Sequence, residues 1–288
     1  MIDWLLVPLS YGFMQRGLAA SLMVGVLCAI VGCYVVLRSM AFLGDAMAHA
    51  ILPGVAVAYL LKGNLFFGAL VAAVIVALSI GFFSRQGAIK EDTAIGVLFA
   101  AALASGVALI STVKTYAVDL THILFGNVLG VSSTDLFLTA GVGLGVLITI
   151  LLLYKEFLVI SFDPLFAATL RLPVETLRTV MLVLLALTIV VSLQTVGVGL
   201  VTAMLVTPGA TAYLLSKRLS TMMAISAAVG AVSTIAGLYL SFYINVASGA
   251  AVVLVATGIF VLVFVFAPAR GMLWRFVHRP SAYGAGRS

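Results

Sequence analysis

The chain has 288 residues, of which 64% are hydrophobic and only 8% are charged. Soluble domains usually carry about a quarter of charged residues, so a fully water-covered surface is excluded and lipid must surround most of this chain. The net charge of +6 is therefore interpreted as a signal for membrane orientation, and we expect no nucleic-acid partner. Cys28 and Cys33 form no C-x-x-C motif, and we interpret both as packed core residues.

The apolar stretches predict an all-α, polytopic transmembrane helix bundle of about nine spans, in a single domain over residues 1–288. Helices are expected because a segment in lipid must satisfy its own backbone hydrogen bonds. Residues 1–16 would form a surface helix or part of a tenth span, and 268–288 would form a tail. The predicted spans are 17–37, 41–61, 65–83, 94–113, 135–153, 177–195, 197–216, 222–243 and 247–267.

Lysine and arginine residues are spread unevenly between these spans. If the N-terminus lies outside, 12 of them fall on the inner side and three, Arg16, Lys62 and Lys114, on the outer side. Basic residues favour the cytoplasmic face of a membrane. The chain is therefore predicted to be a multi-pass protein of the cell membrane with a cytoplasmic C-terminus.

The second span carries Asp45, the one acidic residue that we place inside a membrane helix, and His49 one turn later. Residues at i and i+4 share a helix face, and ionisable groups in a bilayer usually face a cavity or a partner. The pair supplies two ligands for a divalent metal, and two copies of the helix across a two-fold axis would supply four. The residue types leave three roles open: metal transit, a structural hydrogen-bonded pair, and a proton relay in a secondary, proton-coupled transporter.

Two spans contain an internal proline, at Pro53-Gly54 and at Thr207-Pro208-Gly209. Proline removes a backbone hydrogen bond, so a kink is expected at each place. The kinks are either tolerated irregularities or hinges for alternating access. Gly197 and Gly199 mark a tight turn or a broken helix between the sixth and seventh spans.

Three polar residues lie on the predicted outer side. Asp119 and His122 are spaced i, i+3 and could guide cations inward or could simply be solvated. Asn245 lies at the turn between the last two spans, where it could contact a passing ion or only form the turn.

The longest inner loop, 154–176, contains the start of a short helix, with Asp163 as N-cap and Pro164 at the first helical position. This helix would expose an apolar knob formed by Leu165, Phe166, Leu170 and Leu172. An exposed apolar patch fits either lipid headgroups or a cytoplasmic partner.

The chain contains no G-x-x-x-x-G-K-[ST] motif for ATP and no arrangement of residues for covalent catalysis. We therefore expect a transport subunit that is not itself an enzyme and that holds no permanently bound cofactor.

Five stretches resemble the metal-type ABC importer permeases, which are the membrane subunits of manganese, zinc and chelated-iron uptake systems. The resemblance runs from about residue 15 to 267. It is carried by Met40-Ala-Phe-Leu-Gly-Asp-Ala-Met-Ala-His-Ala-Ile-Leu-Pro-Gly-Val-Ala56, Ile89-Lys-Glu-Asp-Thr-Ala-Ile-Gly96, Asp119-Leu-Thr-His-Ile-Leu-Phe-Gly-Asn127, Phe162-Asp163-Pro164 and Thr207-Pro208.

The resemblance implies a homodimeric or paired permease with the larger, vitamin-uptake-like importer fold. In this family the residues that match Asp45 and His49 line the translocation path. A metal-binding protein would dock outside, and a cytoplasmic ATPase pair would dock on the loop 161–176. The docking residues that we expect on that loop are Asp163, Pro164, Leu165, Phe166 and Arg171.

The same resemblance favours manganese over iron or zinc as the transported metal. The stretches 89–93 and 122–127 are similar to those of the manganese and iron branch. Asn245 stands where some zinc members have an acidic residue, which disfavours zinc.

Overall fold

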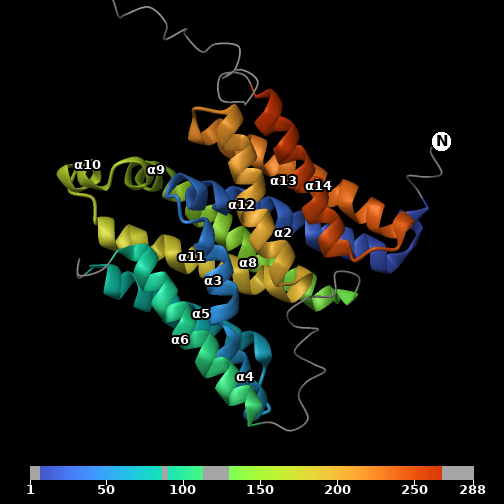
Figure 1. Ribbon diagram of the computed structural model, residues 1–288, viewed down its shortest axis with the longest axis horizontal. Coiled ribbons are helices and arrows are strands. Elements are labelled where there is room, and N and C mark those ends of the chain that lie inside the picture. The colour runs from blue at the N-terminus through green and yellow to red at the C-terminus, as the bar shows by residue number, and fades with distance from the viewer. Residues whose placement is uncertain (1–6, 86–89, 113–129, 268–288) are drawn as a thin grey trace, which may run out of the picture.

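A computed structural model of the protein describes residues 7–85, 90–112 and 130–267, and within these residues every regular element is a helix. Figure 1 shows α2, α12 and α13 in the middle of the molecule, with α4, α5 and α6 grouped along one side and α9 and α10 at one edge. The elements are η1 (Pro8–Ser10), α2 (Gly12–Leu37), α3 (Ala41–Ala50), α4 (Leu52–Leu60), α5 (Leu65–Arg85), α6 (Glu91–Ser111), α8 (Ser133–Leu152), α9 (Tyr154–Phe162), α10 (Pro164–Thr169), α11 (Val174–Val196), α12 (Val198–Leu215), α13 (Leu219–Ile244) and α14 (Ser248–Phe266).

Nine helical segments of the described chain are long and apolar enough to cross a membrane, with α3 and α4 counted as one segment. This confirms the predicted fold class. The first span begins at Gly12, five residues earlier than expected, so residues 12–16 belong to that span. The prediction of a surface helix or a tenth span was therefore wrong for residues 12–16. The predicted tail, 268–288, lies outside the described residues.

The core of the bundle is built around α2 and α11, which are the most buried spans, whereas α6, α8 and α14 are the most exposed ones. Side-chain hydroxyls help to join α2 to its neighbours, since Ser226 on α13 donates a hydrogen bond of 2.7 Å to the Ala29 carbonyl. Interhelical bonds of this kind stabilise bundles in lipid, where the hydrophobic effect between helices is weak. The exposed apolar faces of α6, α8 and α14 are suited to contact acyl chains.

The second span is two helices, because α3 ends at Ala50 and α4 begins at Leu52 with Pro53 in its first turn. The backbone N–H groups of Gly54 and Val55 both donate to the Ile51 carbonyl, which links the two pieces. The predicted kink is thus confirmed as a break. By contrast, α12 continues through Pro208 as one helix. The predicted junction near residue 197 is also confirmed, since Gly197 has a φ of 83° between α11 and α12.

A pair of glycines brings α4 against α5. A Cβ atom on Gly54 would collide with the Gly68 carbonyl, and a Cβ atom on Gly68 would collide with the Gly54 carbonyl. Small residues at such contacts allow two backbones to approach closely. The second half of the broken span, α4, is therefore packed closely against α5.

Candidate functional site

Asp45 and His49 lie on one face of α3, as their spacing predicts. The His49 Nδ1 atom lies 3.0 Å from the backbone oxygen of Asp45 and 3.7 Å from its Oδ1 atom. A backbone carbonyl only accepts hydrogen bonds, so Nδ1 must carry the proton in this arrangement. In the neutral imidazole the lone pair then remains on Nε2, and this is the usual arrangement of a histidine that binds metal.

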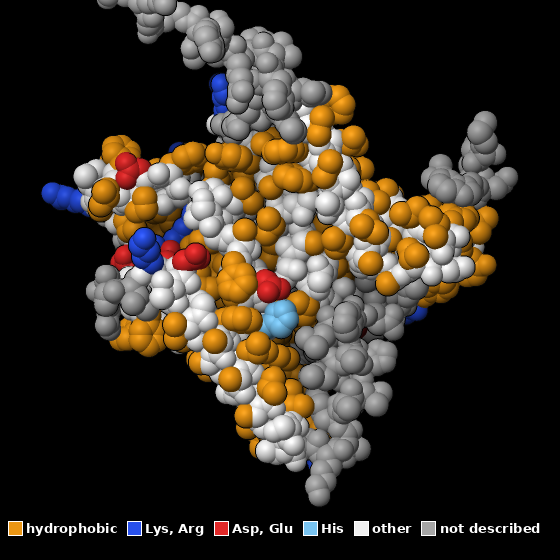
Figure 2. All heavy atoms as spheres, viewed as in Figure 1, with side chains coloured by type: hydrophobic (Ala, Val, Ile, Leu, Met, Phe, Trp, Pro, Cys, Tyr) orange, Lys and Arg blue, Asp and Glu red, His pale blue; other side chains and the backbone are white. Residues whose placement is uncertain are grey.

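The same face of α3 is open in the single subunit. The side chain of Asp45 is 45% exposed and that of His49 is 30% exposed, whereas the neighbouring Leu43, Gly44 and Met47 are buried. Figure 2 shows that hydrophobic side chains cover most of the surface drawn, and that charged ones gather mainly at the end that carries α9 and α10. The pair is thus a polar position that the subunit leaves accessible.

An aromatic side chain of α6 lies against this polar face. The Phe99 ring packs edge-on to the His49 ring, with centroids 6.0 Å apart, and edge-on to Phe42 at 5.7 Å. The position of the imidazole therefore depends on α6 as well as on α3.

The described residues of one subunit do not complete a metal site. Among the described residues, no group of three or more histidine, cysteine, aspartate or glutamate side chains could hold a metal ion. A transition metal in a protein usually has four or more ligands. Asp45 and His49 can therefore supply only part of a coordination shell.

The residues predicted for the outer path are only partly described. Asp119 and His122 lie outside the described residues. Asn245 ends α13 with a left-handed φ of 56°, a conformation that asparagine tolerates better than most residues. Asn245 therefore lies in the turn after α13, and its contact with a passing ion stays a prediction.

The predicted short helix is present as α10. The Asp163 Oδ1 atom accepts hydrogen bonds from the backbone N–H groups of Leu165 and Phe166, at 2.9 and 3.0 Å, so Asp163 is the N-cap. Pro164 occupies the first turn. Arg171 follows the helix with a φ of 58° and is exposed.

The predicted apolar knob is present with one correction. Leu165 is 81% exposed, Phe166 54% and Leu170 52%. Leu172 is instead partly buried against the core, because the chain turns toward α11 after α10. The exposed knob consists of Leu165, Phe166 and Leu170.

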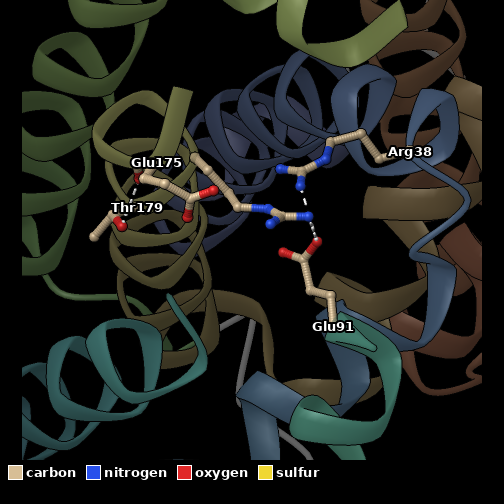
Figure 3. Close-up of polar contacts among 5 residues, drawn as sticks. Arg38, Glu91, Glu175 and Thr179 are labelled. Atoms are coloured by element: carbon tan, nitrogen blue, oxygen red, sulfur yellow. Dashed lines mark hydrogen bonds and ion pairs between the residues drawn. The ribbon is translucent and has the colours of Figure 1, made fainter. Parts of the chain in front are cut away.

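A buried ionic cluster was missed by the sequence analysis. One carboxylate oxygen of Glu91, Oε2, lies 2.9 Å from Arg38 Nη2 and 2.6 Å from Arg178 Nη2 (Figure 3). The side chains of Arg38 and Glu91 are each only 11% exposed. Burial lowers the pKa of Arg38 and the Glu91 carboxylate opposes that shift. The sequence showed these residues only as charges at span ends.

A multi-span helical bundle with an accessible carboxylate–imidazole pair on a broken membrane helix is typical of a membrane transport protein. Residues 10–267 match the model of a protein family, the ABC 3 transport family. The chain belongs to that family, which confirms the resemblance found in the sequence motifs.

Three relatives illustrate this membership. The manganese transport system membrane protein MntC of Halalkalibacterium halodurans is 50% identical over 268 residues, which cover 93% of this chain and 92% of MntC. The chelated iron transport system membrane protein YfeD of Yersinia pestis is 40% identical over 259 residues, covering 90% of this chain and 87% of YfeD. A chain in the solved structure of PsaBC from Streptococcus pneumoniae in complex with Fab is 38% identical, with a TM-score of 0.84 and coverage of 97% of this chain and all of that one.

Proposed function

We propose that the protein is the membrane-spanning permease of an ATP-driven importer and that it translocates a divalent metal ion, with manganese as the favoured cargo. The observation that carries this proposal is the partly exposed Asp45–His49 pair, which offers a carboxylate and the Nε2 lone pair of the imidazole. Membership of the ABC 3 transport family supports the energy source. The manganese and iron systems among its relatives support the class of cargo.

A second copy of the permease completes the metal site in this proposal. Two donors from each subunit would meet across a two-fold axis and give a transient set of two oxygen and two nitrogen ligands. Transport requires that the ion also leaves, so these few ligands must bind weakly enough for release. Acid should weaken binding, because a proton competes with the metal for the imidazole of His49.

The proposed orientation places the end that carries α9 and α10 in the cytoplasm, together with the C-terminus. This orientation follows the excess of basic residues in the predicted inner loops. The knob of Leu165, Phe166 and Leu170 would then meet a cytoplasmic ATPase subunit, with Arg171 beside it. A metal-binding protein would deliver the ion outside, near Asp119, His122 and Asn245.

The test of the metal site is uptake of radioactive manganese by the complete transporter in liposomes. Asp45→Ala and His49→Ala should each reduce uptake to the background of ATP-free vesicles, while both variants still assemble with the ATPase. Asp92→Asn, a change of an exposed acid that makes no ion pair with the described residues, is the matched control. Wild-type uptake by both site variants would refute the assignment.

The same vesicles distinguish the proton-coupled alternative. Permease alone, without ATPase, should show no uptake when only a pH gradient is imposed. Gradient-driven uptake under those conditions would establish a secondary transporter instead.

The test of the docking surface is co-purification with the ATPase. Leu165→Ser combined with Phe166→Ser should reduce ATPase recovery, because an apolar contact is lost. Phe137→Ser on α8, at a position that is 76% exposed, is the matched control. Equal recovery for both variants would exclude the knob as the docking surface.

A further inference from the structure

The Arg38–Glu91–Arg178 cluster is incompletely satisfied. Both guanidinium groups contact the same oxygen, Glu91 Oε2. Glu91 Oε1 and Arg38 Nη1 are buried and have no hydrogen-bond partner within the described structure. An arginine–carboxylate pair is strongest when two parallel hydrogen bonds form, and here that geometry is absent. Such an arrangement contributes less to stability than its charges allow, because a buried donor and a buried acceptor remain unsatisfied.

A second carboxylate lies beside the cluster. Glu175, in the first turn of α11, attracts Arg38 electrostatically but forms no ion pair with any described residue. Figure 3 shows its carboxylate on the side of α11 that faces the cluster. Two guanidinium groups therefore lie near two carboxylates, and within the described structure only the Glu91 carboxylate forms ion pairs with them.

The two carboxylates begin helices that lead to different parts of the molecule. Glu91 begins α6, and two turns later Phe99 on the same helix packs against the His49 ring. Glu175 lies in the first turn of α11, the next helix after α10, and α10 carries Leu165 and Phe166 of the exposed knob. The cluster is thus the ionic connection between the α10–α11 region and the helix that covers the metal-binding imidazole.

We propose that Glu91, Glu175, Arg38 and Arg178 form a relay in which the arginines exchange carboxylates during transport. In the present state Arg178 is held by Glu91, so α6 is fixed and Phe99 lies on His49. When α10 and α11 move together, Arg178 passes to Glu175, α6 is then held by Arg38 alone, and Phe99 withdraws from the site. This inference rests on the proposed function, because it needs Asp45 and His49 to bind the cargo. A packed bundle favours such an exchange between two discrete arrangements over a gradual deformation.

Glu175→Gln in the complete transporter is the decisive variant, because Glu175 holds no ion pair in this state. If the cluster were purely structural, it would not need the Glu175 carboxylate. Because Glu175 is half-buried, we expect the Glu175→Gln variant to fold normally. The relay predicts that manganese uptake per ATP hydrolysed falls about tenfold in this variant. This is the size expected when a typical coupling free energy between two sites, here the α10–α11 region and the metal site, is lost. Thermal stability and ATPase recovery should equal those of the Asp92→Asn control.

Arg38→Gln combined with Glu91→Gln tests the other half of the relay. This double variant removes one charge of each sign, so that Arg178 is left facing Glu175 and no net charge is added to the bundle. Uptake per ATP should again fall while ATP hydrolysis continues.

The outcomes distinguish the relay from a purely structural cluster and from a docking role. Wild-type uptake per ATP in Glu175→Gln would overturn the relay, and so would a loss of ATPase recovery, which would assign Glu175 to docking. If Asp45→Ala and His49→Ala abolish uptake while the relay variants do not affect it, the relay alone fails. If the Asp45 and His49 variants transport normally, the proposed function itself fails.

Discussion

The two polar groups of this bundle differ in how the chain builds them. Asp45 and His49 belong to one short helix and remain 45% and 30% exposed. Arg38, Glu91 and Arg178 come from three separate spans, and their side chains are only 11 to 25% exposed. The comparison shows that one bundle holds charged groups in two ways, either open with unused ligand atoms or closed around a shared carboxylate.

The physical consequences of the two arrangements are opposite. The open pair is partly exposed, so its position costs less than full burial would, and its side chains make few contacts that stabilise the fold. The closed cluster loses its hydration, and its charges are tolerated only because they neutralise one another. Removal of a side chain should therefore reduce metal transport at the Asp45–His49 pair, whereas it should reduce the stability of the fold at the Arg38–Glu91–Arg178 cluster.

The largest effect on stability is expected for Glu91→Ala. This change leaves two largely buried guanidinium groups, 11% and 25% exposed, without a carboxylate contact and should cost up to about 3–5 kcal/mol of unfolding free energy. The measurement is chemical denaturation of the purified permease in detergent. Asp92→Ala, at the exposed neighbouring position, should change the value by less than about 0.5 kcal/mol. Equal stability of the two variants would show that the cluster does not hold the spans together.

A smaller loss of stability is expected at the contact between α4, which follows the helix of the open pair, and α5. In Gly54→Ala the new methyl group would collide with the Gly68 carbonyl and with Ala72, so the helices must separate. Overpacking of this kind costs about 1–3 kcal/mol. Gly141→Ala on α8 is the control, because a methyl group there meets no atom within 4 Å. A loss of stability in Gly141→Ala equal to that in Gly54→Ala would show that the close contact is not the cause.

The spans and the open pair could be predicted from the sequence because the rules that place them are local. Lipid imposes helices on long apolar stretches, so span positions follow from composition. The i, i+4 spacing alone puts Asp45 and His49 on one face. The cap of α10 was also predictable, since Asp163 and Pro164 act within a single turn.

The closed cluster could not be predicted because tertiary packing decides which charges meet. Glu91 is 53 residues from Arg38 and 87 residues from Arg178. Each residue by itself shows only a charge near a span end, which counting rules assign to a loop. Leu172 was misplaced for the same reason, because its burial depends on the turn of the chain toward α11.

The smallest effect on stability is expected for Asp45→Ala combined with His49→Ala. Both side chains are partly exposed, and the only hydrogen bond of the imidazole within the described structure is to the backbone of its own helix. The double variant should therefore unfold within about 0.5 kcal/mol of the wild type. Measured beside Glu91→Ala in the same detergent, it tests the structural Asp–His pair that the sequence left open. A loss of several kcal/mol would mean that the pair holds α3 in place, and loss of uptake in these variants would then report misfolding instead of a missing metal site.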